Sequence, residues 1–246
     1  MTGMFDLAVL KRIVAAAACA GILAGLLLTA VQQVRVVPVL LEAEVYEAAT
    51  AAGLPAANAG SSAGHEHGSE HPAHGLQRTL LSAAANVTLA LGFALLLVAA
   101  MLVSRAEPGW RSGLAWGLAG YAVFFLAPSL GLPPEVPGTE AALLTQRQFW
   151  WLSTVLCTSA GLSLLVFGRA WVLRIVGMLL LLVPHVAGAP QPQIHSSTAP
   201  AEAVDAFISA AVLTNLVFWL ALGSLLGFFH GKFRPRDAEV PSAVAS

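Results

Sequence analysis

Charged residues are scarce in this chain of 246 residues: they make up 10% of it, against roughly 25% in soluble globular domains. Hydrophobic residues make up 57%, and a chain of this composition would not stay soluble. The net charge of -1 is too small to suggest nucleic-acid binding, and no basic cluster is interleaved with aromatic residues. We therefore expect the lipid bilayer to be the main partner and expect no nucleic acid.

Cysteines and enzyme motifs are also rare or absent. Cys19 and Cys157 lie in separate apolar runs, so neither a disulfide framework nor a CxxC site is indicated. The sequence contains no GxxxxGK[ST] phosphate loop, no HExxH and no GxSxG, and no apolar run offers a nucleophile and a base at a recognisable spacing. We expect neither ATP hydrolysis nor an enzyme.

Long apolar runs, in contrast, are abundant. A bilayer core about 30 Å thick requires roughly 20 apolar residues in a helix. Residues 150–168 and 171–188 are separated by three residues, but one continuous run would be too long for a single span, so two short helices fit better. The sequence predicts an all-α polytopic bundle, a single membrane domain of about six spans, at residues 13–34, 79–103, 113–130, 150–168, 171–188 and 206–229.

The first run could also be a cleaved signal peptide, because Lys11 and Arg12 precede it. A signal peptide has an apolar region of about 7 to 15 residues, whereas this run continues to Val31. An uncleaved membrane helix is therefore the preferred interpretation.

The basic residues predict the orientation, because positively charged loops stay in the cytoplasm. With the N-terminus inside, three basic residues lie outside, namely Arg35, Arg78 and Arg147. Nine lie inside, namely Lys11, Arg12, Arg105, Arg111, Arg169, Arg174, Lys232, Arg234 and Arg236. Six spans with both termini in the cytoplasm follow from this asymmetry.

The longest outer connection, residues 35–78, ends in a histidine-rich segment at 64–74. A flexible linker at 51–64 precedes the segment, which also contains Glu66 and Glu70. Imidazole suits Co, Ni, Cu and Zn, so the segment predicts exchangeable capture of a divalent transition metal, although a merely solvated low-complexity segment is the alternative. The candidate ligands are His65, His67, His71 and His74.

Three further outer residues are candidate metal ligands. His185 follows Pro184 at the end of an expected span, and His195 lies in the proline-rich segment after it; each could equally be an interfacial anchor. Glu44 and Glu47 would share a helix face if the first helix continued, although a solvated helix end is the simpler interpretation.

The expected spans contain no Asp or Glu, whereas ion pumps and proton-driven antiporters usually place an ionisable residue in the membrane. Gln32, Asn86 and Asn215 could line a polar path, but hydrogen bonding between helices is the commoner use of such residues. The small-residue spacings Gly21/Gly25 and Gly113/Gly117/Gly120 predict close helix packing.

Several stretches of the sequence resemble the CbtA-type family of proposed cobalt transporter subunits. They are residues 27–44, the histidine segment, and residues 75–81, 124–138 and 183–192 with His195. The resemblance implies a bacterial inner-membrane subunit for cobalt uptake, connected with cobalamin supply and accompanied by a small single-span, histidine-bearing partner, CbtB. Descriptions of the family often count five spans, whereas the basic residues here indicate six.

Residues and resemblance together predict a metal-uptake subunit with no tightly bound cofactor. The histidine segment would capture Co²⁺ outside, and the bundle, alone or with a partner, would pass it inward. Histidine ligands serve Ni²⁺ and Zn²⁺ as well, so the ligands do not identify the metal. The alternative is a metal-binding sensor or assembly scaffold without transport activity.

Overall fold

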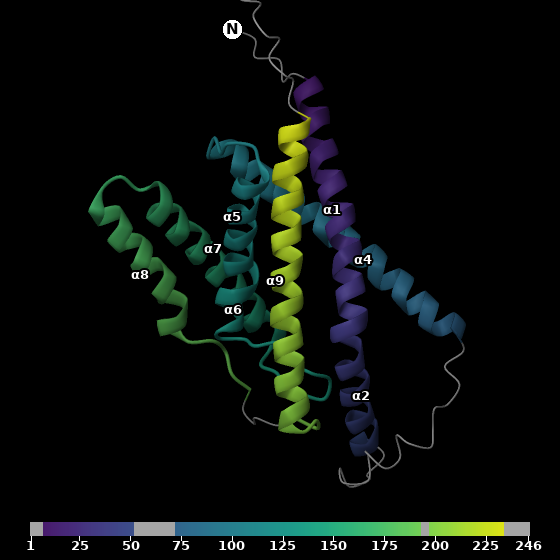
Figure 1. Cartoon of the computed structure of the whole chain (residues 1–246). Coiled ribbons are helices and arrows are strands. Elements are labelled where there is room, and N and C mark those ends of the chain that lie inside the picture. The colour runs from purple at the N-terminus through teal and green to yellow at the C-terminus, as the bar shows by residue number, and fades with distance from the viewer. Residues whose placement is uncertain (1–6, 52–71, 193–196, 234–246) are drawn as a thin grey trace, which may run out of the picture.

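The computed structural model describes residues 7–51, 72–192 and 197–233, and its regular elements are helices (Figure 1). An isolated bridge between Thr139 and Ser197 is the one β-type pairing in these ranges. The elements are α1 (Leu7–Arg35), α2 (Val37–Ala51), α4 (Pro72–Val103), α5 (Trp110–Tyr121), the π-helix η1 (Ala122–Leu126), α6 (Ala127–Ser129), α7 (Leu144–Phe167), α8 (Trp171–Ala187) and α9 (Ala201–Lys232). The predicted all-α polytopic bundle is confirmed.

Five helical stretches are long and apolar enough to cross a membrane, namely Leu7–Arg35, Gly75–Val103, Trp110–Ser129, Leu144–Phe167 and Ala201–Lys232. Helix α8 is apolar but shorter, at 17 residues, which is near the lower limit for a span. The start of α1 and the end of α9 lie at the same end of the bundle (Figure 1). A chain whose two ends lie on the same side crosses the membrane an even number of times, so this arrangement agrees with six crossings if α8 is counted. The positions of the membrane boundaries stay a prediction.

Glycines bring the helix backbones into direct contact at two seams. A Cβ atom on Gly25 of α1 would lie 2.6 Å from the Cα of Val87 in α4. In the second seam, Gly113 and Gly117 of α5 lie against Gly223 of α9. Lipid tails are as apolar as the helix side chains, so moving apolar side chains from lipid into a helix interface gives little free energy. Close backbone packing of this kind therefore holds membrane helices together.

We expect Gly113→Ala to destabilise the bundle by about 1–3 kcal/mol, because the new methyl group would meet the backbone of α9 at Gly223 and Gly227. Gly92→Ala is the matched control, since nothing lies within 4 Å of a Cβ at Gly92. That control should be neutral or stabilising by up to about 1 kcal/mol. Thermal unfolding in detergent measures both variants. Equal stability of the two would contradict the proposed backbone contact.

An aromatic cluster fills the middle of the bundle. The Trp219 side chain of α9 is 2% exposed and stacks on Phe124 of η1, with ring centroids 5.5 Å apart and planes 6° apart. Phe93 of α4 contacts both rings. The π-helical turn places Phe124 at this contact just before Pro128, which lacks an amide donor. The cluster therefore joins α4, η1 and α9.

Helices α7 and α8 form an antiparallel hairpin beside the bundle, on the left in Figure 1. Gly161 of α7 and Gly177 of α8 face each other, so that a Cβ on either would lie 2.8 Å from the carbonyl oxygen of the other. Large apolar side chains of the hairpin face outward, such as Phe149, 76% exposed, and Val186, 84% exposed. Exposure of this kind is expected of a surface that contacts lipid.

The expected outer connection 35–78 is helical over much of its described part. The first helix is interrupted at Val36 and continues as α2, with Leu40 N–H donating to the carbonyl of Val36 at 2.9 Å. Pro38 is tolerated because it lies in the first turn of α2, where an amide donor is not required. The acidic segment is therefore a helix, and Glu42 and Glu47 on it are exposed, as the interpretation of a solvated helix end requires.

Candidate functional site

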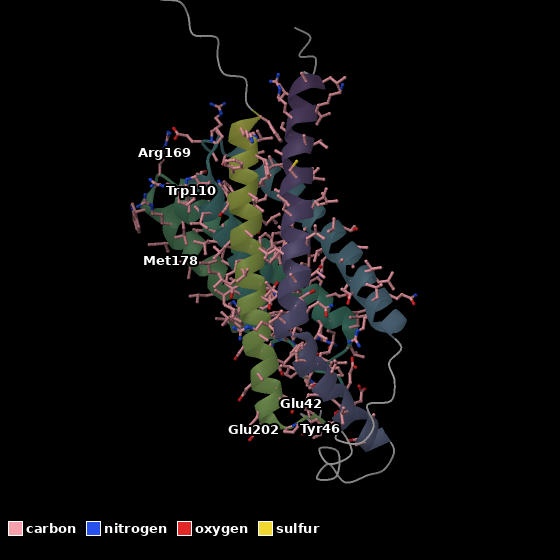
Figure 2. All side chains as sticks on the ribbon, turned by 45° about the vertical axis from the view of Figure 1, so that its right-hand side comes forward. Glu42, Tyr46, Trp110, Arg169, Met178 and Glu202 are labelled. Atoms are coloured by element: carbon pink, nitrogen blue, oxygen red, sulfur yellow. The ribbon has the colours of Figure 1, made fainter. Side chains whose placement is uncertain are left out.

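Acidic and basic residues mark opposite ends of the bundle. Glu42 and Glu202 lie at one end and Arg169 lies at the other (Figure 2). The acidic end is the predicted outer end, and it carries α2 and the first turn of α9. The candidate metal ligands whose positions are described also belong to this end, so the site is built there.

A polar cluster lies between α1 and α4. The Asn86 side-chain amide donates to Gln32 Oε1 at 2.6 Å and to Thr29 Oγ1 at 3.0 Å. The hydroxyl of Thr29 in turn donates to the carbonyl of Gly25 at 3.0 Å. Two of the three expected polar-path residues, Gln32 and Asn86, are thus in direct contact.

Asn215 does not join this cluster. Its side-chain amide donates at 3.0 Å to the carbonyl of Ala211, one turn earlier in α9. The bonds among Thr29, Gln32 and Asn86 are of the interhelical kind that commonly stabilises membrane helices. If an ion passed here, Thr29, Gln32 and Asn86 would have to break these hydrogen bonds in order to coordinate it.

Polar contacts continue from this cluster toward the outer end. Gln33 Nε2 donates to Thr79 Oγ1 at 3.2 Å. Beyond that pair, Arg78 Nη2 lies 3.2 Å from Glu44 Oε1, and both side chains are more than 40% exposed. An exposed ion pair of this kind contributes about 0–1 kcal/mol, so a divalent cation could displace Arg78 at little cost. Glu44 is therefore positioned on α2 and accessible to metal.

Two proline-rich loops form a cap over the outer end between α2 and α9. The first loop connects α6 to α7, and the second connects α8 to α9. Residue Ala43 of α2 is buried with Val136 of the first loop, Ala199 of the second and Ala203 of α9. The loops pair where Thr198 N–H donates to the carbonyl of Gly138 at 3.3 Å. The position of Glu44 is thereby fixed relative to the cap, because the adjacent residue is part of its core.

An open cavity of about 280 Å³ lies between the two loops and the start of α9. Its polar lining comes from Glu135, Glu140, Thr139, Gln191 and Ser197, among prolines. Glu135 is neutralised by Arg147, whose Nη2 lies 2.7 Å from its Oε2 with both side chains partly buried. The cavity therefore offers oxygen donors from two loops that are far apart in sequence.

Sequence reasoning did not single out Glu140 or Gln191 as site residues. Glu140 follows Gly138 and Thr139 in one proline-rich loop, and Gln191 lies between Pro190 and Pro192 in the other. The repeated proline and glycine pattern in the two loops was the available signal, since loops of similar character at the same end of a bundle can meet.

His185 is held against Trp150 rather than in the cap cavity. The two rings make an edge contact with centroids 6.0 Å apart, and His185 is half-buried. Trp150 Nε1 donates to the carbonyl of Pro184 at 3.1 Å, which fixes the last turn of α8 against α7. The imidazole is therefore anchored in the last turn of α8, and it is absent from the lining of the cavity.

The remaining candidate ligands fall outside what the structure describes. His65, His67, His71 and His195 lie in segments that it leaves out, and of His74 only the backbone, in the first turn of α4, is placed. His195 belongs to the stretch between Pro192 and Ser197, both of which line the cavity. Among the described residues no group of three or more His, Cys, Asp or Glu side chains could hold a metal ion. A metal site with three or more such ligands would therefore need histidines outside the described residues, or ligands from another chain.

Comparison with known families gives one match. The model of the family described as "Probable cobalt transporter subunit (CbtA)" matches residues 10–231, which is most of the chain. No curated protein and no solved structure matches it significantly.

Proposed function

Because the chain belongs to the CbtA family of probable cobalt transporter subunits, we propose that it captures Co²⁺ at its acidic outer end and passes it inward through the helical bundle. The family match over residues 10–231 is the observation that carries this proposal. The multi-pass helical fold agrees with a role in transport. We also propose that the membrane is the bacterial inner membrane.

The histidine segment is the proposed capture device. It lies between α2, which ends at Ala51, and the first turn of α4, which begins at Pro72. A tethered set of imidazoles raises the local concentration of metal beside the bundle without requiring a fixed geometry. Captured Co²⁺ would then exchange to ligands fixed on the fold.

The receiving ligands are proposed to be Glu44 and His185, whose positions are described, and His195, which lies outside the described residues. Glu44 is available through its weak ion pair with Arg78, and His195 is flanked by two residues that line the cap cavity. Nickel and zinc accept the same donors, so selection of cobalt would depend on geometry and supply.

Passage through the bundle is the more demanding step, since the expected spans offer no carboxylate to replace the hydration shell of the ion. The amides of Gln32 and Asn86 are polar groups within the α1–α4 seam, inward of the Gln33–Thr79 pair. We propose that a small single-span subunit of the CbtB type supplies further histidine ligands. The family description itself names a subunit, which agrees with a partner chain.

The driving force does not require ATP. A divalent cation that enters a cell with an inside-negative potential of 100 mV gains about 4.6 kcal/mol, enough for roughly thousandfold accumulation.

A first prediction concerns topology. A reporter fused after Ser246 is expected to behave as cytoplasmic, and one inserted in residues 52–71 should report from outside. The physical reason is the concentration of basic residues at one end. An external signal from the C-terminal fusion would mean that α8 does not cross the membrane.

A second prediction concerns the metal. The purified chain should bind Co²⁺ with an affinity that falls as pH decreases through about 6.5, because protonated imidazole cannot coordinate metal. Calorimetry at two pH values, on the natural chain and on a variant with His65, His67, His71 and His74 changed to alanine, measures this. Identical heats for the two chains would contradict capture by the histidine segment.

The second candidate function is a metal sensor or assembly scaffold that binds cobalt outside and transports none. The hydrogen bonds that the amides of Gln32 and Asn86 already make favour this reading over an open path. Such a protein would retain metal binding while leaving cellular cobalt unchanged, so uptake measurements distinguish the two.

A further inference from the structure

The basic end of the bundle contains a second cavity, of about 610 Å³, that the transport proposal does not use. It lies between the first turns of α1, the end of α4 with the loop after it, and the end of α9. Arg12, Arg105 and His230 line it, together with Glu107, so its charge is positive on balance. Both arginine side chains are exposed.

The backbone at Arg105 is unusual. Ala106 N–H donates to the carbonyl of Met101 at 2.9 Å, and Arg105 N–H donates to that of Leu102 at 3.1 Å, which is the bonding of a Schellman helix end. The residue at this position adopts a left-handed conformation, here with φ of 53°, and is usually glycine. An arginine here is strained, which points to a use for its side chain.

The remaining walls of the cavity are apolar and continue onto a surface that faces lipid. Val9 and Ile13 of α1 and Met101 and Leu102 of α4 line the cavity. Beside them, Val103 is 87% exposed. A charged recess that opens onto apolar helix faces at the membrane interface matches a molecule with an anionic head and hydrocarbon chains.

We propose that this cavity binds the phosphate headgroup of an anionic phospholipid from the cytoplasmic leaflet. Arg12 and Arg105 would donate charge-assisted hydrogen bonds to the phosphate oxygens, and the acyl chains would lie along α1 and α4 below. The lipid would thereby join the ends of α1, α4 and α9, which belong to distant parts of the sequence.

Native mass spectrometry of the full chain in detergent, mixed with equal amounts of phosphatidylglycerol and phosphatidylcholine, tests the proposal. We expect phosphatidylglycerol to be retained about tenfold more, which corresponds to the weaker end of the range for one hydrogen bond to a charged group. The double variant Arg12→Gln/Arg105→Gln should lose this preference. Arg169→Gln is the matched control, because it removes a basic residue from the same end but outside the cavity. An equal loss in the control, or no preference in the natural chain, would overturn the proposal.

Two further experiments test whether Arg105 serves only packing and whether the cavity recognises a soluble phosphate instead of a lipid. Arg105→Gly relieves the backbone strain, so its unfolding temperature should hold or rise while the preference for phosphatidylglycerol falls. A fall in both would assign Arg105 to packing and overturn the proposal. Glycerol 3-phosphate at millimolar concentration should not displace the bound lipid, because the chains contribute to binding. Displacement would mean that the cavity recognises a soluble phosphate instead.

Discussion

Changing His65, His67, His71 and His74 together to alanine is expected to lower cobalt uptake at least about tenfold when external cobalt is scarce. Uptake at abundant cobalt should stay within about twofold of the natural chain. The reason is that a flexible tether raises local metal concentration and adds nothing once the fixed site is saturated. Uptake of radiolabelled cobalt, measured across external concentrations in cells that express each chain at equal level, gives the two curves.

Changes of Ser61 and Ser62 in the linker and of Ser69 in the histidine segment to alanine serve as the control, since they alter this stretch without removing an imidazole. These serine changes should leave cobalt uptake unchanged at both scarce and abundant external cobalt. If the histidine variant instead lowers uptake equally at every concentration, the segment is the essential site rather than a capture device.

Changing His185 to alanine is expected to lower uptake about tenfold at every cobalt concentration, with the protein still inserted and abundant. His185 is fixed against Trp150 at the outer end of the hairpin, so it acts as part of the entry site and excess metal cannot replace it. The same uptake assay over the same concentrations measures this variant beside the histidine-segment variant. The two curves therefore differ in shape as well as in height.

His185→Phe separates coordination from packing, because phenylalanine keeps an aromatic contact with Trp150 and has no ligand atom. Uptake should stay low in this variant if the imidazole binds cobalt. Recovery with phenylalanine would assign His185 a structural role. If His185→Ala has no effect while loss of the histidine segment lowers uptake throughout, the entry site lies elsewhere.

The helices could be predicted from the sequence because the bilayer imposes a minimum length of apolar residues. Each expected span lies within a helical stretch or extends beyond its end by one residue. Two spans were expected to end at Gly168 and Gly188, and the helices α7 and α8 end one residue earlier. The close approach at Gly25 and Gly113 was also predictable, since small residues four apart are typical of tightly packed membrane helices. Local chemistry was sufficient for these features.

Features that depend on tertiary neighbours could not be predicted. Nothing in the sequence near Asn215 indicates that its amide bonds to its own helix while that of Asn86 bonds to another. The π-helical turn before Pro128 carries Phe124, which stacks on Trp219 of a helix far along the chain. Glu140 and Gln191 line one cavity because two distant loops pair.

The central claim, that this chain passes cobalt across the membrane, is tested most directly by radiolabelled cobalt accumulation in otherwise identical cells with and without it. The account predicts accumulation that depends on the chain, reaches up to roughly a thousandfold at 100 mV and collapses when the membrane potential is dissipated. Equal accumulation with and without the chain, while the inserted protein still binds cobalt and its partner subunit is present, would contradict transport and favour a sensor or scaffold.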